Sequence, residues 1–172
     1  GSMKIECKKN HKLLWILSYG YLAIPVIIFL LGWVKLYISI PISVCIIYSF
    51  ILVIRNTPNV KIQFSQNRVR LAIVFVLLFV WTIYSGVGGL MWQNRWDHMF
   101  RNAIFSDLVR FQWPVINHSL AVPRTLCYYL GFWLPSALIG KLFGYQAGYA
   151  FQFIWAYIGV TLSFLLLSEY LK

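Results

Sequence analysis

The sequence predicts an all-α, polytopic membrane protein with about five transmembrane helices and an amphipathic helix in an outer loop. Three observations carry this prediction. Hydrophobic residues make up 60% of the 172 residues and charged residues only 11%, whereas roughly a quarter of the residues in a soluble domain are charged. Several apolar runs are long enough to cross a bilayer. The basic residues behind the net charge of +11 flank those runs.

Five apolar segments approach the roughly 20 residues that a bilayer-spanning helix requires. They are residues 13–34, 36–54, 71–91, 125–140 and 148–168. The fourth segment is interrupted by Gly131, Pro135 and Gly140, which membrane helices tolerate when neighbouring groups satisfy the backbone. We expect a single membrane domain over residues 3–172. Residues 1–2 are left out because they resemble a cloning remnant before a start methionine.

Lysine and arginine residues set the expected orientation. Residues 4–12 carry four lysines, and residues 55–70 carry four basic residues and no acid. Both segments should face the cytoplasm, because cytoplasmic loops are enriched in Lys and Arg. The loop 92–124 is then outside, the turn 141–145 inside and the C-terminal Glu169 outside. Anionic membrane lipids, rather than nucleic acid, are the expected partners of the positive charge.

Residues 94–111 of the outer loop have the hydrophobic period of a helix. Apolar residues recur at spacings of three and four, at Trp96, Phe100, Ala103, Ile104, Leu108 and Phe111. We expect this helix to lie along the membrane interface, with the apolar stripe in the headgroup boundary. Asp97 can pair with Arg101, and Asp107 with Arg110, because residues three or four apart meet on one helix face. The alternative interpretation is an interfacial helix that carries only solvated ion pairs.

Two stretches, "WQNRWDHMFRNAIFSDLVRFQWPV" and "CYYLGFWLPSALIGKLFG", resemble the N-terminal part of bacterial polytopic proteins related to GT-C glycosyltransferases. The resemblance covers residues 97–144. It implies a membrane glycosyltransferase-like protein of the cell envelope, or the N-terminal half of one, in a bacterial plasma membrane. Such enzymes transfer a sugar from a polyprenyl-phosphate donor at the outer face, with an acidic residue of an outer loop. Carried over by position, Asp97 is the general base and Asp107 the second acid.

The resemblance also points to other polar residues of the loop as substrate ligands. The leaving polyprenyl phosphate is negatively charged, and the planar fork of arginine matches phosphate geometry. This favours Arg101, Arg110 and Arg124 as its ligands. The rest of the predicted binding set consists of Asn94, Trp96 and His98.

No cofactor is expected. A divalent metal between His98, Asp97 and Asp107 is the alternative, because hard cations take oxygen ligands. The three cysteines lie far apart and form no CxxC, so we predict neither a disulfide framework nor a zinc site. The "GVGG" at 86–89 lacks the Lys-Ser/Thr of a phosphate loop, and we interpret it as a site of close helix packing or as a flexible exit from the span.

Two other classes of function remain open. The first is a non-catalytic small subunit or scaffold of a cell-envelope glycan or lipid enzyme, which would work with partner membrane subunits. It fits a chain with fewer spans than GT-C enzymes usually have. The second is a small transporter. Ion-coupled carriers place acids within their spans, and none of the four acids here falls in a predicted span.

Overall fold

A computed structural model describes residues 11–56, 68–91, 93, 96–117 and 123–170. Within these residues the chain is mainly helical, as predicted, with connecting turns and one small sheet that was not predicted. The helices are α1 (His11–Trp33), α2 (Leu36–Asn56), α3 (Arg68–Tyr84), η1 (Val87–Gly89), α4 (Asp97–Arg110), η2 (Leu130–Phe132), α5 (Leu134–Phe143) and α6 (Tyr145–Tyr170). Two short strands, β1 (Ile116–Asn117) and β2 (Arg124–Thr125), pair antiparallel.

Three helices are long and apolar enough to cross a membrane. The qualifying stretches are Lys12–Trp33 in α1, Leu36–Asn56 in α2 and Tyr145–Ser168 in α6, with mean hydropathies of 2.2, 2.4 and 1.8. Helix α3 is apolar but has only 17 residues, fewer than the roughly 20 that a perpendicular span needs. The chain therefore has the features of an integral membrane protein, while the predicted number of five spans is not confirmed.

The predicted span at residues 125–140 is not a continuous helix. The segment begins in β2, passes through η2, and enters α5 only at Leu134. Pro135 stands at the start of α5, where its fixed φ suits a first turn but would disrupt a longer helix. With ten residues, α5 is about 15 Å long, half of the roughly 30 Å hydrocarbon core.

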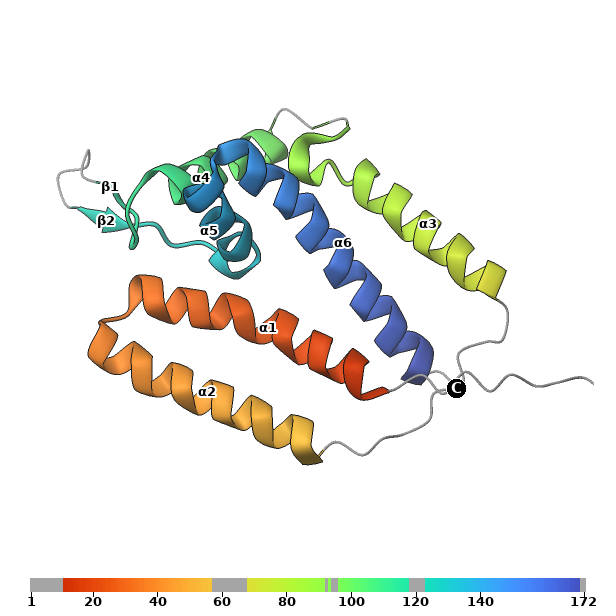
Figure 1. Cartoon of the computed structure of the whole chain (residues 1–172). Coiled ribbons are helices and arrows are strands. Elements are labelled where there is room, and N and C mark those ends of the chain that lie inside the picture. Colours follow the sequence, from red (N-terminus) through yellow and green to blue (C-terminus); the bar gives the residue numbers. More distant parts are fainter. Residues whose placement is uncertain (1–10, 57–67, 92, 94–95, 118–122, 171–172) are drawn as a thin grey trace, which may run out of the picture.

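The long helices run between two ends of the molecule (Figure 1). Helices α1 and α2 form an antiparallel hairpin, and α3 lies along α6. Helix α4, the small sheet and α5 gather at the end where α3 finishes and α6 begins. The end of α6 lies at the opposite end, beside the start of α1. The prediction, by contrast, placed Glu169 and the N-terminus at opposite ends of the molecule.

The contacts of Lys141 also show which segments lie together at this end of the molecule. Its Nζ donates hydrogen bonds to the main-chain carbonyls of Val109, at 3.3 Å, and of Phe111. The ammonium also lies 5.2 Å from the centroid of the Trp113 ring. The predicted inner turn 141–145 therefore begins in contact with the predicted outer loop, and the two were wrongly assigned to opposite sides.

Cysteine labelling tests this arrangement. Phe143 and Arg124 are exposed, and each is replaced by cysteine in a chain whose native cysteines are serine. We expect an impermeant maleimide to label both positions from the same side of the membrane, because α5 is too short to separate them. Labelling of one without permeabilisation, and of the other only after it, would restore the five-span topology.

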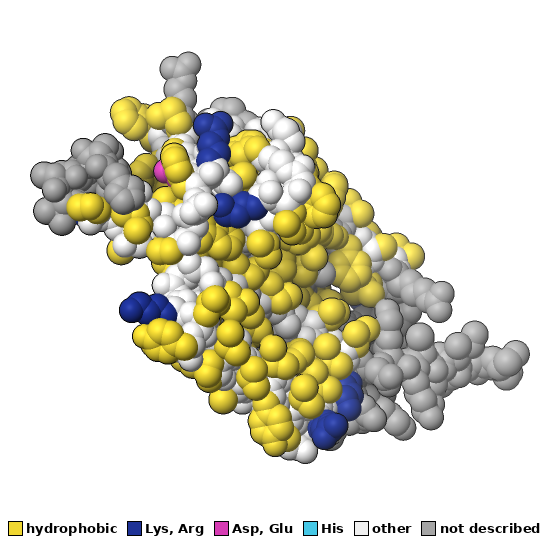
Figure 2. All heavy atoms as spheres, turned by 60° about the vertical axis from the view of Figure 1, so that its left-hand side comes forward, with side chains coloured by type: hydrophobic (Ala, Val, Ile, Leu, Met, Phe, Trp, Pro, Cys, Tyr) yellow, Lys and Arg dark blue, Asp and Glu magenta, His cyan; other side chains and the backbone are white. Residues whose placement is uncertain are grey.

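The buried core lies at the end formed by α4 and α5. It consists of Ile104, Phe105, Leu108, Val115, Leu130, Trp133, Leu134 and Ala137. Elsewhere the helices present apolar side chains outward; within α2, for example, the buried residues are Ser39 and Ser43. Figure 2 shows hydrophobic side chains over much of one face, with Lys and Arg toward its upper and lower parts. Exposed apolar helices of this kind require a lipid environment.

The predicted apolar stripe of α4 is divided between two faces. Ile104 and Leu108 are buried together with Phe105, whereas Trp96, Phe100, Ala103 and Phe111 are exposed. The buried residues pack against α5. The apolar period in the sequence therefore arises partly from contacts within the protein and partly from an exposed apolar surface. That α4 lies along a membrane interface stays a prediction, and only its exposed apolar residues could contact the lipid.

Glycines allow the closest approaches of helices at this end. A Cβ on Gly148 of α6 would lie 2.6 Å from both the Gly140 Cα and the Ser136 carbonyl oxygen of α5. In η1, Gly88 and Gly89 have φ of 76° and 72°, and added Cβ atoms there would collide with α6. The interpretation of "GVGG" as a close packing site is confirmed.

Candidate functional site

Asp97 and Arg101 form an ion pair at the start of α4. Asp97 occupies the first turn, where the positive end of the helix dipole favours a carboxylate. Its Oδ2 lies 2.9 Å from Arg101 Nη2, with 54% of the Asp97 side chain and 35% of the Arg101 side chain exposed. The predicted pairing is confirmed. The carboxylate is accessible, and the guanidinium beside it is partly buried.

Tyr128 packs against α4 at Phe100, the residue before Arg101. The Phe100 ring meets the edge of the Tyr128 ring, with centroids 5.9 Å apart, and the Tyr128 hydroxyl donates to the Tyr129 hydroxyl at 2.7 Å. That hydrogen bond is the main reason why the pKa of Tyr128 is raised, and the charges of Arg101 and Asp97 act on the same hydroxyl with opposite signs. The segment before η2 is therefore part of the environment of the α4 ion pair.

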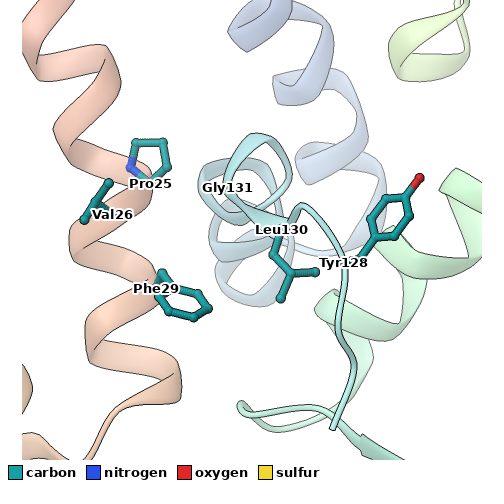
Figure 3. A pocket seen from close by; sticks show the side chains of 6 residues that line it. All are labelled: Pro25, Val26, Phe29, Tyr128, Leu130 and Gly131. Carbon is teal, nitrogen blue, oxygen red and sulfur yellow. The ribbon is translucent and has the colours of Figure 1, made fainter.

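An apolar pocket adjoins Tyr128. It has a volume of about 230 Å³ and is lined by Pro25, Val26, Phe29, Tyr128, Leu130 and Gly131. In Figure 3 Pro25 and Phe29 of α1 lie toward Leu130 and Gly131, while the Tyr128 hydroxyl points away from α1. Tyr128 thus links two environments. It lines the apolar pocket, and its hydroxyl is influenced by the charges of Asp97 and Arg101.

A second apolar pocket lies between α1 and α6. It has a volume of about 350 Å³ and is lined by Tyr21, Phe132, Ala156, Gly159, Val160 and Ser163. Tyr21 is four residues before Pro25 on α1, and Phe132 follows Gly131 directly. The two pockets are therefore neighbours along α1, one helical turn apart.

Asp107 and the other two arginines do not join this site. No ion pair links Asp107 to Arg110, contrary to the prediction. Asp107 is ten residues beyond Asp97, which places it about 15 Å further along α4. Arg110 is exposed in the last turn, and Arg124 is exposed in β2, opposite Asn117.

The remaining predicted residues have separate surroundings. His98 Nε2 is hydrogen bonded to the main-chain carbonyl of Ser85 at 2.9 Å, so its ring ties α4 to the end of α3. Trp96 is 84% exposed just before α4. Asn94 lies outside the described residues. Among the residues that are described, no three His, Cys, Asp or Glu side chains gather where they could hold a metal ion.

A polar network that the sequence did not predict joins α4 to α6. Gln93 Nε2 donates to the Tyr149 hydroxyl at 2.7 Å, and that hydroxyl donates to Asn102 Oδ1 at 3.1 Å. Asn102 Nδ2 donates back to Gln93 Oε1 at 3.0 Å. A polar residue such as Asn102 in an amphipathic helix indicates that the side chain has a hydrogen-bond partner. The sequence could not identify that partner, because Tyr149 on α6 is 47 residues away.

Comparisons with protein-family models, with curated proteins and with solved structures find no match for this chain.

Proposed function

We propose that this protein is a membrane glycosyltransferase-like protein, or part of one, that acts on a polyprenyl-phosphate-linked sugar. One juxtaposition supports the proposal most. An accessible carboxylate and a partly buried guanidinium are paired on α4, and Tyr128, whose hydroxyl is influenced by both charges, also lines an apolar pocket. A polyprenyl-phosphate sugar has an anomeric carbon that a hydroxyl can attack, a phosphate and a hydrocarbon chain. The carboxylate can activate the attacking hydroxyl, the guanidinium can bind the phosphate, and the apolar pocket can hold the chain.

In the proposed transfer step, Asp97 is the general base. An acceptor hydroxyl attacks the anomeric carbon of the sugar, and the bond from that carbon to the phosphate oxygen breaks. Asp97 takes the proton of the attacking hydroxyl as a general base. Polyprenyl phosphate leaves with the bonding electron pair, and its charge increases as it does so.

Arg101 is the proposed ligand of the leaving phosphate. Its Nη2 engages Asp97, and its buried Nε has no hydrogen-bond partner within the described part of the chain. A guanidinium offers five donors in a fixed fork, so one arginine can hold a carboxylate and a phosphate together. The apolar pocket beside Tyr128 would receive the first isoprene units of the lipid.

A non-catalytic subunit that binds a lipid phosphate is the second candidate. It is favoured by the distance of Asp107 from the ion pair, which leaves Asp97 without a second acid nearby on α4. A transporter is supported less, since Asp97 and Asp107 both lie on α4, outside the three helices that can span a membrane.

Binding of a lipid phosphate tests the proposal through Arg101. The protein in nanodiscs is titrated with a polyprenyl-phosphate sugar, and affinity is measured by native mass spectrometry. We expect Arg101→Ala to weaken binding about tenfold or more, because a hydrogen bond to a charged group contributes about 1.5–3 kcal/mol. Arg110→Ala is the matched control, since Arg110 is exposed on the same helix. Failure of the unmodified protein to bind, or equal losses in both variants, would contradict the proposal.

A further inference from the structure

Gln93, Asn102 and Tyr149 form a closed ring of hydrogen bonds. Each side chain donates to the next and accepts from the one before, at 2.7, 3.1 and 3.0 Å. We call these three residues the amide–tyrosine ring. Gln93 also donates to the main-chain carbonyl of Gly86 at 2.8 Å. The ring therefore joins the segment after α3, helix α4 and helix α6 at one point.

The ring holds the side of α4 that is turned away from Asp97. Asn102 is five residues after Asp97, which places the two side chains about 140° apart around the helix. The ion pair with Arg101 and the contact of Phe100 with Tyr128 lie on the other side. A small rotation of α4 at the ring would therefore move Asp97 relative to Tyr128 and the apolar pocket.

The apolar contacts of α4 alone would fix its rotation less well. Ile104, Phe105 and Leu108 bury one face of the helix, and apolar packing is largely non-directional. Hydrogen bonds require particular angles, and they are strong where water is excluded. The Tyr149 ring is itself held in place, because it stacks on Tyr145 at 5.6 Å and lies 5.9 Å from Phe105.

We propose that the amide–tyrosine ring is a positioning device, which sets the rotation of α4 and so aims Asp97 and Arg101 at the lipid phosphate sugar. This inference rests on the proposed function. The ring residues do not touch the reacting atoms; they act through α4. Tyr149 is the most informative member, since its hydroxyl bonds both of the other side chains.

Tyr149→Phe removes the hydroxyl and keeps the aromatic ring. Tyr145→Phe is the matched control, because Tyr145 lies one turn earlier on α6 and its hydroxyl has no hydrogen-bond partner among the described residues. We expect Tyr149→Phe to lower kcat about tenfold at unchanged KM for the lipid, because a misplaced catalytic group slows the chemical step. Tyr145→Phe should leave both constants within about twofold of the unmodified protein.

A distance measurement separates this inference from the proposed function. Spin labels at Met99→Cys on α4 and Arg124→Cys on β2, in a chain without native cysteines, report the placement of α4 by pulsed electron resonance. We expect Tyr149→Phe, but not Tyr145→Phe, to shift or broaden the distance distribution. A shift in a protein without turnover would support positioning and overturn the enzyme proposal. An unchanged distribution with unchanged kcat, even at a lower melting temperature, would reduce the ring to a structural contact and overturn the inference.

Discussion

Asp97→Asn is expected to reduce sugar transfer by about 10²- to 10⁴-fold, the usual contribution of a general base. The amide keeps the shape of the carboxylate but cannot take the proton of the acceptor hydroxyl. Folding should be preserved, because Asp97 is more than half exposed, and an exposed ion pair contributes only about 0–1 kcal/mol. The measurement is turnover of a polyprenyl-phosphate sugar by the purified variant in nanodiscs.

Asp107→Asn is the control for this experiment. Asp107 lies on the same helix and has no ion pair with Arg110, so we expect its replacement to change turnover no more than about twofold. Lipid-phosphate binding should survive in both variants, since Asp97→Asn leaves Arg101 in place. Near-normal turnover by Asp97→Asn would show that Asp97 is not the base.

Gly148→Ala is expected to give the largest loss of stability. The new methyl group would lie 2.6 Å from the Gly140 Cα and from the Ser136 carbonyl oxygen. These are backbone atoms of α5, so the clash cannot be relieved by rotating a side chain. Overpacking of this kind costs about 1–3 kcal/mol, and separation of α5 from α6 would also disturb Val109, which packs over Gly140.

Thermal unfolding in detergent measures this effect against Gly20→Ala. A methyl group on Gly20 of α1 would meet only the tip of the Phe50 ring, at 3.9 Å, which is ordinary contact. We expect Gly20→Ala to change the free energy of unfolding by less than about 0.5 kcal/mol. Equal melting temperatures for the two variants would mean that α5 and α6 do not cross as closely as described.

The sequence was sufficient to predict the elements that depend on local pattern. Helices α1, α2 and α6 follow from apolar runs long enough for a span, and their bounds agree with the predicted segments to within a few residues. Helix α4 follows from its period, with Asp97–Arg110 observed against 94–111 predicted. The ion pair of Asp97 with Arg101 needs only a helix, because residues four apart always share a face.

The sequence was not sufficient where distant segments decide the structure. Residues 125–140 are apolar enough for a span, but apolar composition serves equally for the short buried helix α5, which packs under α4. That error separated Lys141 from the loop whose carbonyl groups it contacts. The environment of the ion pair was equally hidden, since Tyr128 and the apolar pocket come from segments far from α4 in the chain.

Turnover of a polyprenyl-phosphate sugar by the unmodified protein tests the proposed function most directly. A panel of polyprenyl-phosphate hexoses and pentoses is incubated with the protein in nanodiscs that contain cell-envelope glycans and lipids as acceptors. Released polyprenyl phosphate is measured over time. We predict release that rises with protein concentration, requires an acceptor and is lost in Asp97→Asn. Binding of the lipid without any release from the whole panel would contradict catalysis and leave the non-catalytic subunit as the better description.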